Sequence, residues 1–177
     1  MAEGSRATAI FAGGCFWCIE KGFAELDGVL SAVPGYTGGG SEDPTYSQVA
    51  RGNTGHREAA LVTYDPTIIS YEDLLDAFWR MIDPTDAHGQ FADRGSQYTT
   101  AIFVSSEDER QRAEASKDAL ERSGRFKKPI VTEVLPAGRF WIAEDEHHDY
   151  ASKNSFQYRA YEAGSGRAAF CKRVWKR

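Results

Sequence analysis

Two cysteines separated by two residues, Cys15 and Cys18, are the side chains of this sequence best suited to chemistry. The apolar run 7–12 precedes them and is typical of a buried strand, and Gly13-Gly14 then allows a tight exit from it. Cys15 would follow in the first turn of a helix, where unpaired N–H groups and the helix dipole stabilise an anion. We therefore expect the pKa of Cys15 to lie below the ~8.5 of a free cysteine, and Cys15 to be a nucleophile.

Three interpretations of this pair remain open from the local pattern. The favoured one is a redox or nucleophilic cysteine, with Cys18 able to close a disulfide onto Cys15. A second is half of a zinc site completed by Cys171 or by His147-His148, although zinc usually takes four ligands and no second C-x-x-C motif exists. A third is a pair of buried structural cysteines, because free cysteine is commonly buried.

Composition narrows the class of protein. A length of 177 residues fits a single domain, and a net charge of −5 gives no general attraction to nucleic acid. No apolar stretch approaches the ~18 residues of a membrane helix, and the start lacks a secretory segment. The three cysteines are too few for a secreted disulfide framework. We expect a cytoplasmic monomer, with no nucleic-acid or membrane partner, whose single catalytic domain spans 1–177.

Hydrophobic periodicity predicts an alternation of strands and helices. A long loop is expected over 35–44, where glycines, Ser41, Asp43 and Pro44 gather. The order β-α-β-β-α-β predicts an α+β fold: a two-layer sandwich around a split β-α-β (ferredoxin-like) core. This core would cover 7–158 and carry extra loops, and 159–177 would form an irregular C-terminal tail. Strands are expected at 7–12, 29–33, 58–64, 101–104 and 129–135, and helices at 15–27, 70–81 and 106–123.

A set of short motifs, in order and at sensible spacing, covers roughly residues 7–160. With them the chain resembles the A class of peptide methionine sulfoxide reductases. The motifs are Gly14-Cys15-Phe16-Trp17, Gly35-Tyr36-Thr37-Gly38-Gly39, Asp43-Pro44-Thr45-Tyr46, Thr54-Gly55-His56-Arg57-Glu58, Tyr64-Asp65-Pro66, Asp83-Pro84-Thr85, Asp93-Arg94-Gly95-Ser96-Gln97-Tyr98 and Ala143-Glu144-Asp145-Glu146-His147-His148-Asp149-Tyr150.

The resemblance implies a substrate, the S epimer of methionine sulfoxide, free or in oxidised proteins. Cys15 would attack the sulfur as a thiolate. The sulfoxide oxygen must be protonated to leave, and Glu58 matches the family's acid. Glu58 could serve only if burial raises its pKa and keeps it protonated. Tyr46 and Tyr98 match the tyrosines that hydrogen-bond the oxygen.

The remaining site residues implied by the resemblance form the walls of the substrate pocket. Phe16 and Trp17 would contact the substrate methyl group, and Asp93, His147 and Tyr150 would line or support the pocket. Without the resemblance, each of these side chains is more simply explained as core or surface, and His147 would lie on an acidic surface helix.

Reduction leaves Cys15 as a sulfenic acid, which a second thiol must condense with. The tail positions that carry this thiol in many relatives are Arg159 and Ser165 here. Cys18 is the favoured candidate and Cys171 the alternative. The resemblance implies thioredoxin as electron donor, replaceable by dithiothreitol, with no metal or organic cofactor. The rival functions are a general thiol-disulfide oxidoreductase and a zinc-binding module using Cys15, Cys18 and His147.

Overall fold

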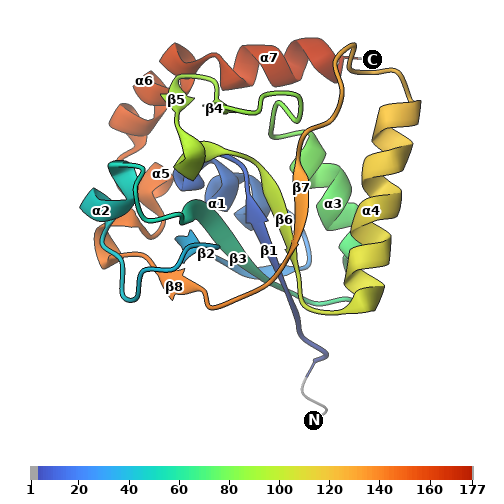
Figure 1. The fold of residues 1–177 in the computed structure, drawn as a ribbon, viewed down its shortest axis with the longest axis horizontal. Helices are drawn as coiled ribbons and strands as arrows, with labels where there is room; N and C mark the ends of the chain where they lie inside the picture. The colour runs from blue at the N-terminus through green and yellow to red at the C-terminus, as the bar shows by residue number, and fades with distance from the viewer. Residues whose placement is uncertain (1–3, 177) are drawn as a thin grey trace.

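The computed structural model describes residues 4–176 and shows one central mixed sheet of six strands (Figure 1). The strand order is β7-β6-β1-β3-β2-β8, and every neighbouring pair is antiparallel except β6 and β7, which run parallel. The strands are β1 (Ala7–Ala12), β2 (Val29–Thr37), β3 (Arg57–Tyr64), β6 (Ala101–Val104), β7 (Glu133–Pro136) and β8 (Trp141–Ile142).

Three helices, α1, α3 and α4, share one hydrophobic core with β1, β3 and β6 and cover one face of the sheet. Within residues 4–176, none of the helices is long and apolar enough to cross a membrane. The helices are α1 (Phe16–Ala24), α2 (Tyr46–Ala50), α3 (Tyr71–Trp79), α4 (Glu107–Arg122), α5 (Tyr150–Lys153), α6 (Ser155–Ser165) and α7 (Arg167–Val174), with short 3-10 helices at Ser96–Tyr98 and Asp145–His147 and a small hairpin of β4 (Gly89–Gln90) and β5 (Asp93–Arg94).

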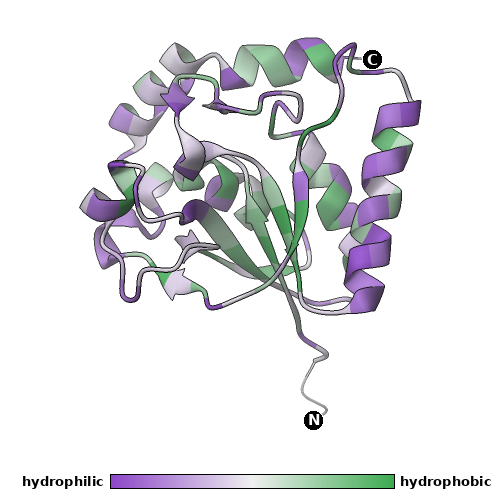
Figure 2. Cartoon of the chain, in the orientation of Figure 1, coloured by the Kyte–Doolittle hydropathy of each residue, from purple (hydrophilic) through white to green (hydrophobic). Residues whose placement is uncertain are grey.

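The helix starts follow local sequence signals. Ser70 caps α3: its side chain accepts from the Asp73 N–H, and the Asp73 carboxylate accepts from the Ser70 N–H. Along α4 only Ala113 and Leu120 are buried, and most of the helix surface is hydrophilic (Figure 2). The helix therefore packs through a narrow apolar stripe, and its charged residues form a solvated face, as its sequence predicts.

The predicted loop over 35–44 is wrong at its beginning. Strand β2 continues to Thr37, which pairs with Arg57, and Tyr36 pairs with Glu58. Tyr36 is fully buried, so its glycine-rich surroundings do not prevent strand formation when a partner strand is present. Strand β7 is also shorter than predicted and begins at Glu133.

The predicted irregular C-terminal tail is wrong. Helices α6 and α7 run along the edge of the molecule opposite the N-terminus (Figure 1). Tyr158 and Arg167 are buried, and Trp175 packs against the main core and contacts the guanidinium groups of Arg80 and Arg125 with its ring. These contacts are tertiary, which is why the short helices lack a clear signal of their own in the sequence.

Candidate active site

Cys15 occupies the N-cap of α1, as its position after the glycines predicts. Gly14 has φ +89°, which lets the chain turn from β1 into the helix, and the Cys15 carbonyl accepts from the N–H groups of Cys18 (3.2 Å) and Ile19 (3.4 Å). Only 5% of Cys15 is exposed. The junction between β1 and α1 therefore holds a buried thiol at a helix N-terminus.

A cavity of about 30 Å³ lies next to this thiol, with room for about two water molecules. Residues from α1, α2, β3, β5, the 3-10 helix Ser96–Tyr98 and α6 meet there, so four of the sequence motifs and the tail converge on one cavity. The lining residues are Cys15, Phe16, Trp17, Tyr46, Glu58, Asp93, Tyr98 and Tyr161.

Glu58 enters the cavity from β3 and is almost fully buried, with 2% of its surface exposed. Its carboxyl oxygen accepts the Phe16 N–H at 3.1 Å. Burial outweighs that hydrogen bond and raises the pKa of Glu58 to about 8 from the ordinary 4.5. The carboxyl group is therefore mostly protonated at neutral pH, as a proton donor must be.

Two tyrosine hydroxyls reach the same cavity from short elements. Tyr46 is the first residue of α2, which Thr45 caps, and its backbone N–H donates to Glu144 Oε2 at 2.9 Å. Tyr98 ends the 3-10 helix Ser96–Tyr98. Burial, with Glu58 nearby, raises the pKa of Tyr46 to about 12 and also that of Tyr98. Both phenols keep their protons at neutral pH and can donate hydrogen bonds.

Trp17, His147 and Tyr150 form a stacked wall beside the cavity. The ring centroids of Trp17 and Tyr150 are 3.8 Å apart. The Trp17 indole N–H donates to His147 Nδ1 at 3.2 Å. His147 in turn contacts Tyr46, with ring centroids 4.4 Å apart. The surface helix expected for His147 without the family resemblance does not form, because this residue is 5% exposed and lies in a 3-10 turn. His147 and Tyr150 back the cavity rather than line it.

The sequence reasoning missed Tyr161. This residue of α6 lines the cavity and donates its hydroxyl to the Asp93 carboxylate. It also meets Trp17 edge-on at 6.0 Å. Tyr161 lies three residues after Tyr158, a helical spacing that could have drawn attention to the tail. The tail is therefore a wall of the site.

The predicted lowering of the Cys15 pKa is wrong for this structure. Burial raises the pKa of Cys15 well above its ordinary value, and a hydrogen bond to Cys18 raises it further. The same bond, together with Arg167 and Tyr158, lowers the pKa of Cys18 to about 7 despite its burial. The hydrogen bond between the two thiols therefore favours Cys18 over Cys15 as the ionised group.

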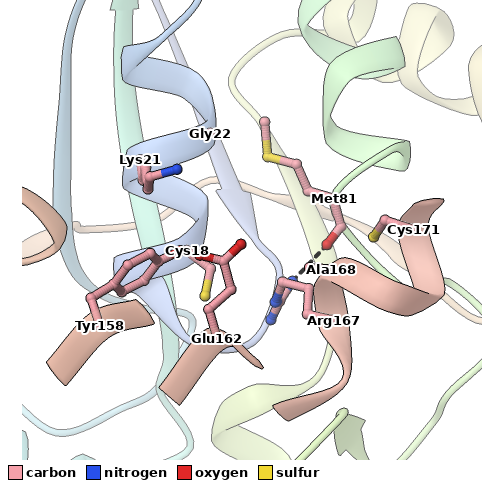
Figure 3. A pocket seen from close by; sticks show the side chains of 9 residues that line it. All are labelled: Cys18, Lys21, Gly22, Met81, Tyr158, Glu162, Arg167, Ala168 and Cys171. Carbon is pink, nitrogen blue, oxygen red and sulfur yellow. Dashed lines mark hydrogen bonds between the residues drawn. The ribbon is translucent and has the colours of Figure 1, made fainter. Parts of the chain in front are cut away.

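A second cavity, of about 160 Å³, lies beside Cys18 (Figure 3). It is lined by Cys18, Lys21, Gly22, Met81, Tyr158, Glu162, Arg167, Ala168 and Cys171. All three cysteines of the chain are free thiols. Cys18 and Cys171 both line this second cavity, and neither lines the one beside Cys15.

The family of this chain follows from its similarity to known proteins. The family model described as peptide methionine sulfoxide reductase matches residues 7–177. The chain belongs to this family. The peptide methionine sulfoxide reductase MsrA of Bacillus licheniformis is 51% identical over 177 residues, which is all of this chain and 97% of the relative.

Solved structures of the family share the fold. Methionine sulfoxide reductase A of Corynebacterium diphtheriae superposes with a TM-score of 0.81 at 33% identity, covering 87% of this chain and 77% of that one. Reduced Mxr1 of Saccharomyces cerevisiae gives a TM-score of 0.80 at 28% identity, covering 85% and 86%. A structure of Mxr1 in complex with Trx2 has the same fold, with a TM-score of 0.57 at 22% identity, covering 82% and 85%.

Among residues 4–176 the side chains proposed for the rival zinc site do not gather around one point. Within residues 4–176 the only group of potential ligands whose atoms gather is Glu144, Glu146 and His147, and two of these three are exposed. Cys15 and Cys18 do not join His147 in such a group. The Glu144 carboxylate is already used, because it accepts from the hydroxyl of Tyr36 at 2.8 Å.

Proposed function

We propose that this chain reduces the S epimer of methionine sulfoxide, free or in oxidised proteins, to methionine, and so repairs oxidised proteins. One observation carries the proposal: a buried carboxyl group with a pKa of about 8 shares a small cavity with a cysteine at a helix N-terminus. This pairing supplies a nucleophile for the sulfur and a proton for the oxygen. A general thiol-disulfide oxidoreductase has no use for Glu58.

In the first step the Cys15 sulfur takes the oxygen atom from the sulfoxide, which becomes methionine. Two electrons pass from Cys15 to the substrate sulfur, the S–O bond to that sulfur is lost, and Cys15 ends as a sulfenic acid. Glu58 gives its proton to the oxygen, and the Cys15 proton passes along the hydrogen bond to Cys18. Charge and protons balance, because Glu58 ends as a carboxylate and Cys18 ends as a thiol.

The cavity walls orient the substrate for this step. Tyr46 and Tyr98 donate hydrogen bonds to the sulfoxide oxygen, where negative charge accumulates before protonation. Phe16 and Trp17 contact the methyl group. Asp93 fixes the hydroxyl of Tyr161, so α6 closes the cavity.

Behind these residues, His147 and Tyr150 hold the Trp17 ring by a hydrogen bond and by stacking. They act as positioning residues, since neither lines the cavity.

Cys18 resolves the sulfenic acid in this account. It lies one helical turn from Cys15, is hydrogen-bonded to it, and has a pKa of about 7, so it is a thiolate near neutral pH. Burial raises the pKa of Cys171 to about 11, so this thiol keeps its proton at neutral pH, and Cys171 lies on α7, whereas Cys18 lies on α1 directly after Cys15. The helix must loosen for the Cys18 sulfur to meet Cys15 at disulfide geometry.

A thioredoxin is the proposed electron donor, supported by the structure of the yeast relative Mxr1 with Trx2. The Cys15–Cys18 disulfide would accept the two electrons directly, without an organic cofactor or metal. We further propose a monomeric single domain over 1–177, and its cytoplasmic location stays a prediction. The split β-α-β description of the core is supported by the order β6-β1-β3-β2, in which each neighbouring pair is antiparallel.

Turnover of each methionine sulfoxide epimer with dithiothreitol tests the function. We expect reduction of the S epimer only, and no activity in the Cys15→Ser variant. Peptide mapping after one equivalent of sulfoxide, without reductant, tests the resolving step. A Cys15–Cys18 linkage supports it, and a Cys15–Cys171 linkage overturns it.

A further inference from the structure

Arg167, the first residue of α7, is a buried cation that the reaction described above does not use. Only 6% of it is exposed. Its guanidinium donates to the Gly13 carbonyl at 3.0 Å and to the Met81 carbonyl at 2.7 Å, and it stacks over the Phe91 ring at 4.8 Å. The side chain therefore reaches from the C-terminal helix to the glycines that precede Cys15.

Among residues 4–176 no carboxylate lies within ion-pair distance of this charge, although Glu162 lines the same cavity. Among the ion pairs of residues 4–176, none includes Arg167. A buried charge without a partner is costly, so its persistence needs a compensating anion. Figure 3 shows the Arg167 guanidinium and the Cys18 sulfur facing the same cavity.

The groups that face Cys18 come from three helices, and Arg167 is the buried cation among them. From α1 come Cys15 and Lys21, from α6 Tyr158 and Glu162, and from α7 Arg167 and Cys171. Lys21 already pairs with Glu25 and has 41% of its side chain exposed, so solvent screens its charge. Tyr158 donates a hydrogen bond to Cys18, and Glu162 opposes the thiolate.

We propose that Arg167 is a positioning residue of the redox cycle, whose buried guanidinium is the counter-charge that keeps Cys18 as the thiolate that attacks oxidised Cys15. The inference rests on the proposed resolving role of Cys18. It makes the C-terminal helix part of the redox site, although the tail positions that carry the resolving cysteine in many relatives are Arg159 and Ser165 here.

The step that Arg167 assists is balanced within the protein. The Cys18 thiolate attacks the Cys15 sulfenic sulfur, a sulfur–sulfur bond forms, and the sulfur–oxygen bond of Cys15 breaks. Cys18, which took up the Cys15 proton in the first step, loses it again before the attack. The oxygen leaves as hydroxide and takes up that proton to become water. Attack needs the thiolate, and a thiol works best when its pKa is close to the ambient pH. Arg167 lowers the pKa of Cys18 toward that point, whereas Glu162 raises it.

The experiment compares Arg167→Gln, which removes the charge, with Arg167→Lys, which keeps it. All variants carry Cys171→Ser, so that only two thiols remain. Lys172→Gln, which removes an exposed charge from the same helix, is the matched control. Peptide-resolved alkylation against pH gives the midpoint for Cys18, and quenched mixing with one equivalent of sulfoxide gives the rates of methionine release and of disulfide formation.

For Arg167→Gln we expect the Cys18 midpoint to rise by about one to two pH units. Disulfide formation at pH 7 should slow by about two- to fivefold, because the lost thiolate is partly offset by greater intrinsic nucleophilicity. The rate should recover at pH 9. Methionine release, in which the Cys18 thiolate accepts the Cys15 proton, should slow at pH 7 as well and recover in the same way. Arg167→Lys and Lys172→Gln should resemble the parent. Glu162→Gln should lower the Cys18 midpoint, because it removes a negative charge that opposes the thiolate. This variant tests the effect of nearby charges on Cys18 even if Arg167→Gln does not fold.

An unchanged Cys18 midpoint and disulfide rate in folded Arg167→Gln would overturn the inference. So would an Arg167→Lys variant as slow as Arg167→Gln, because the role would then be structural, or a Glu162→Gln midpoint that does not fall. Failure of the resolving role itself looks different, since the parent would then form no Cys15–Cys18 disulfide at all.

Discussion

Replacing Glu58 by Gln removes one proton and leaves the shape of the site intact. The amide oxygen can still accept the Phe16 N–H, which lies 3.1 Å from the carboxyl oxygen. The variant cannot protonate the sulfoxide oxygen, and general acids contribute roughly 10²- to 10⁴-fold to such steps. We therefore expect methionine release to fall by that factor at pH 7. Above pH 8, where the Glu58 carboxyl ionises, the ratio of parent to variant rates should shrink about tenfold per pH unit.

The same substitution should change how stability depends on pH. The Glu58 pKa is about 8 in the folded protein against an ordinary 4.5. Between these values the unfolded chain ionises while the folded protein keeps the proton, so the parent loses stability as pH rises, and the loss levels off above pH 8. At about 1.4 kcal/mol per pH unit, the loss is on the order of 4 to 5 kcal/mol. Glu58→Gln should lack this loss.

Urea unfolding of parent and variant at pH 5, 7 and 9, together with single-turnover rates over the same range, provides the assay. We expect the variant to gain stability relative to the parent at each step up to pH 8. Parallel stability curves and a rate ratio independent of pH would refute the reasoning, because Glu58 would then titrate near its ordinary value.

Three further predictions concern the resolving cysteine, the two tyrosines of the cavity and the hydrophobic core. Cys18→Ser should release one methionine per protein and stop at sulfenic acid, which dimedone labelling detects by mass spectrometry, whereas Cys171→Ser should still form the disulfide. Tyr46→Phe and Tyr98→Phe should each slow methionine release by roughly 10- to 100-fold, from the loss of one hydrogen bond to a charged oxygen, with little change in melting temperature. Phe78→Ala, at a fully buried position of α3, should lower the free energy of unfolding by about 3 to 5 kcal/mol in denaturant titrations.

The sequence predicted the regular elements well where local signals were strong. The strand over 101–104 has the predicted bounds, and the helix start at Ser70 with Asp73 forms the expected capping box. Both depend on contacts within a few residues or on a plain apolar run. Placement of Cys15 at the strand–helix junction followed from Gly14 for the same reason.

Long-range features escaped prediction. Helix α6 is stabilised by contacts such as the Tyr161 hydroxyl on Asp93, 68 residues away, and no local pattern encodes that pairing. The predicted pKa shift of Cys15 was wrong for a similar reason. The position at the helix start favours a thiolate, but burial and Cys18 raise the pKa instead of lowering it. For Glu58 the resemblance required a pKa raised by burial. The structure shows that its carboxyl group is buried where β3 borders the small cavity beside Cys15.

The most direct test of the central claim is a single turnover without any reductant. Reduced protein mixed with an excess of each methionine sulfoxide epimer should yield one methionine per protein from the S epimer and none from the R epimer. Peptide mapping of the product should find Cys15 joined to Cys18. Equal reduction of both epimers, or methionine release by Cys15→Ser, would contradict the account.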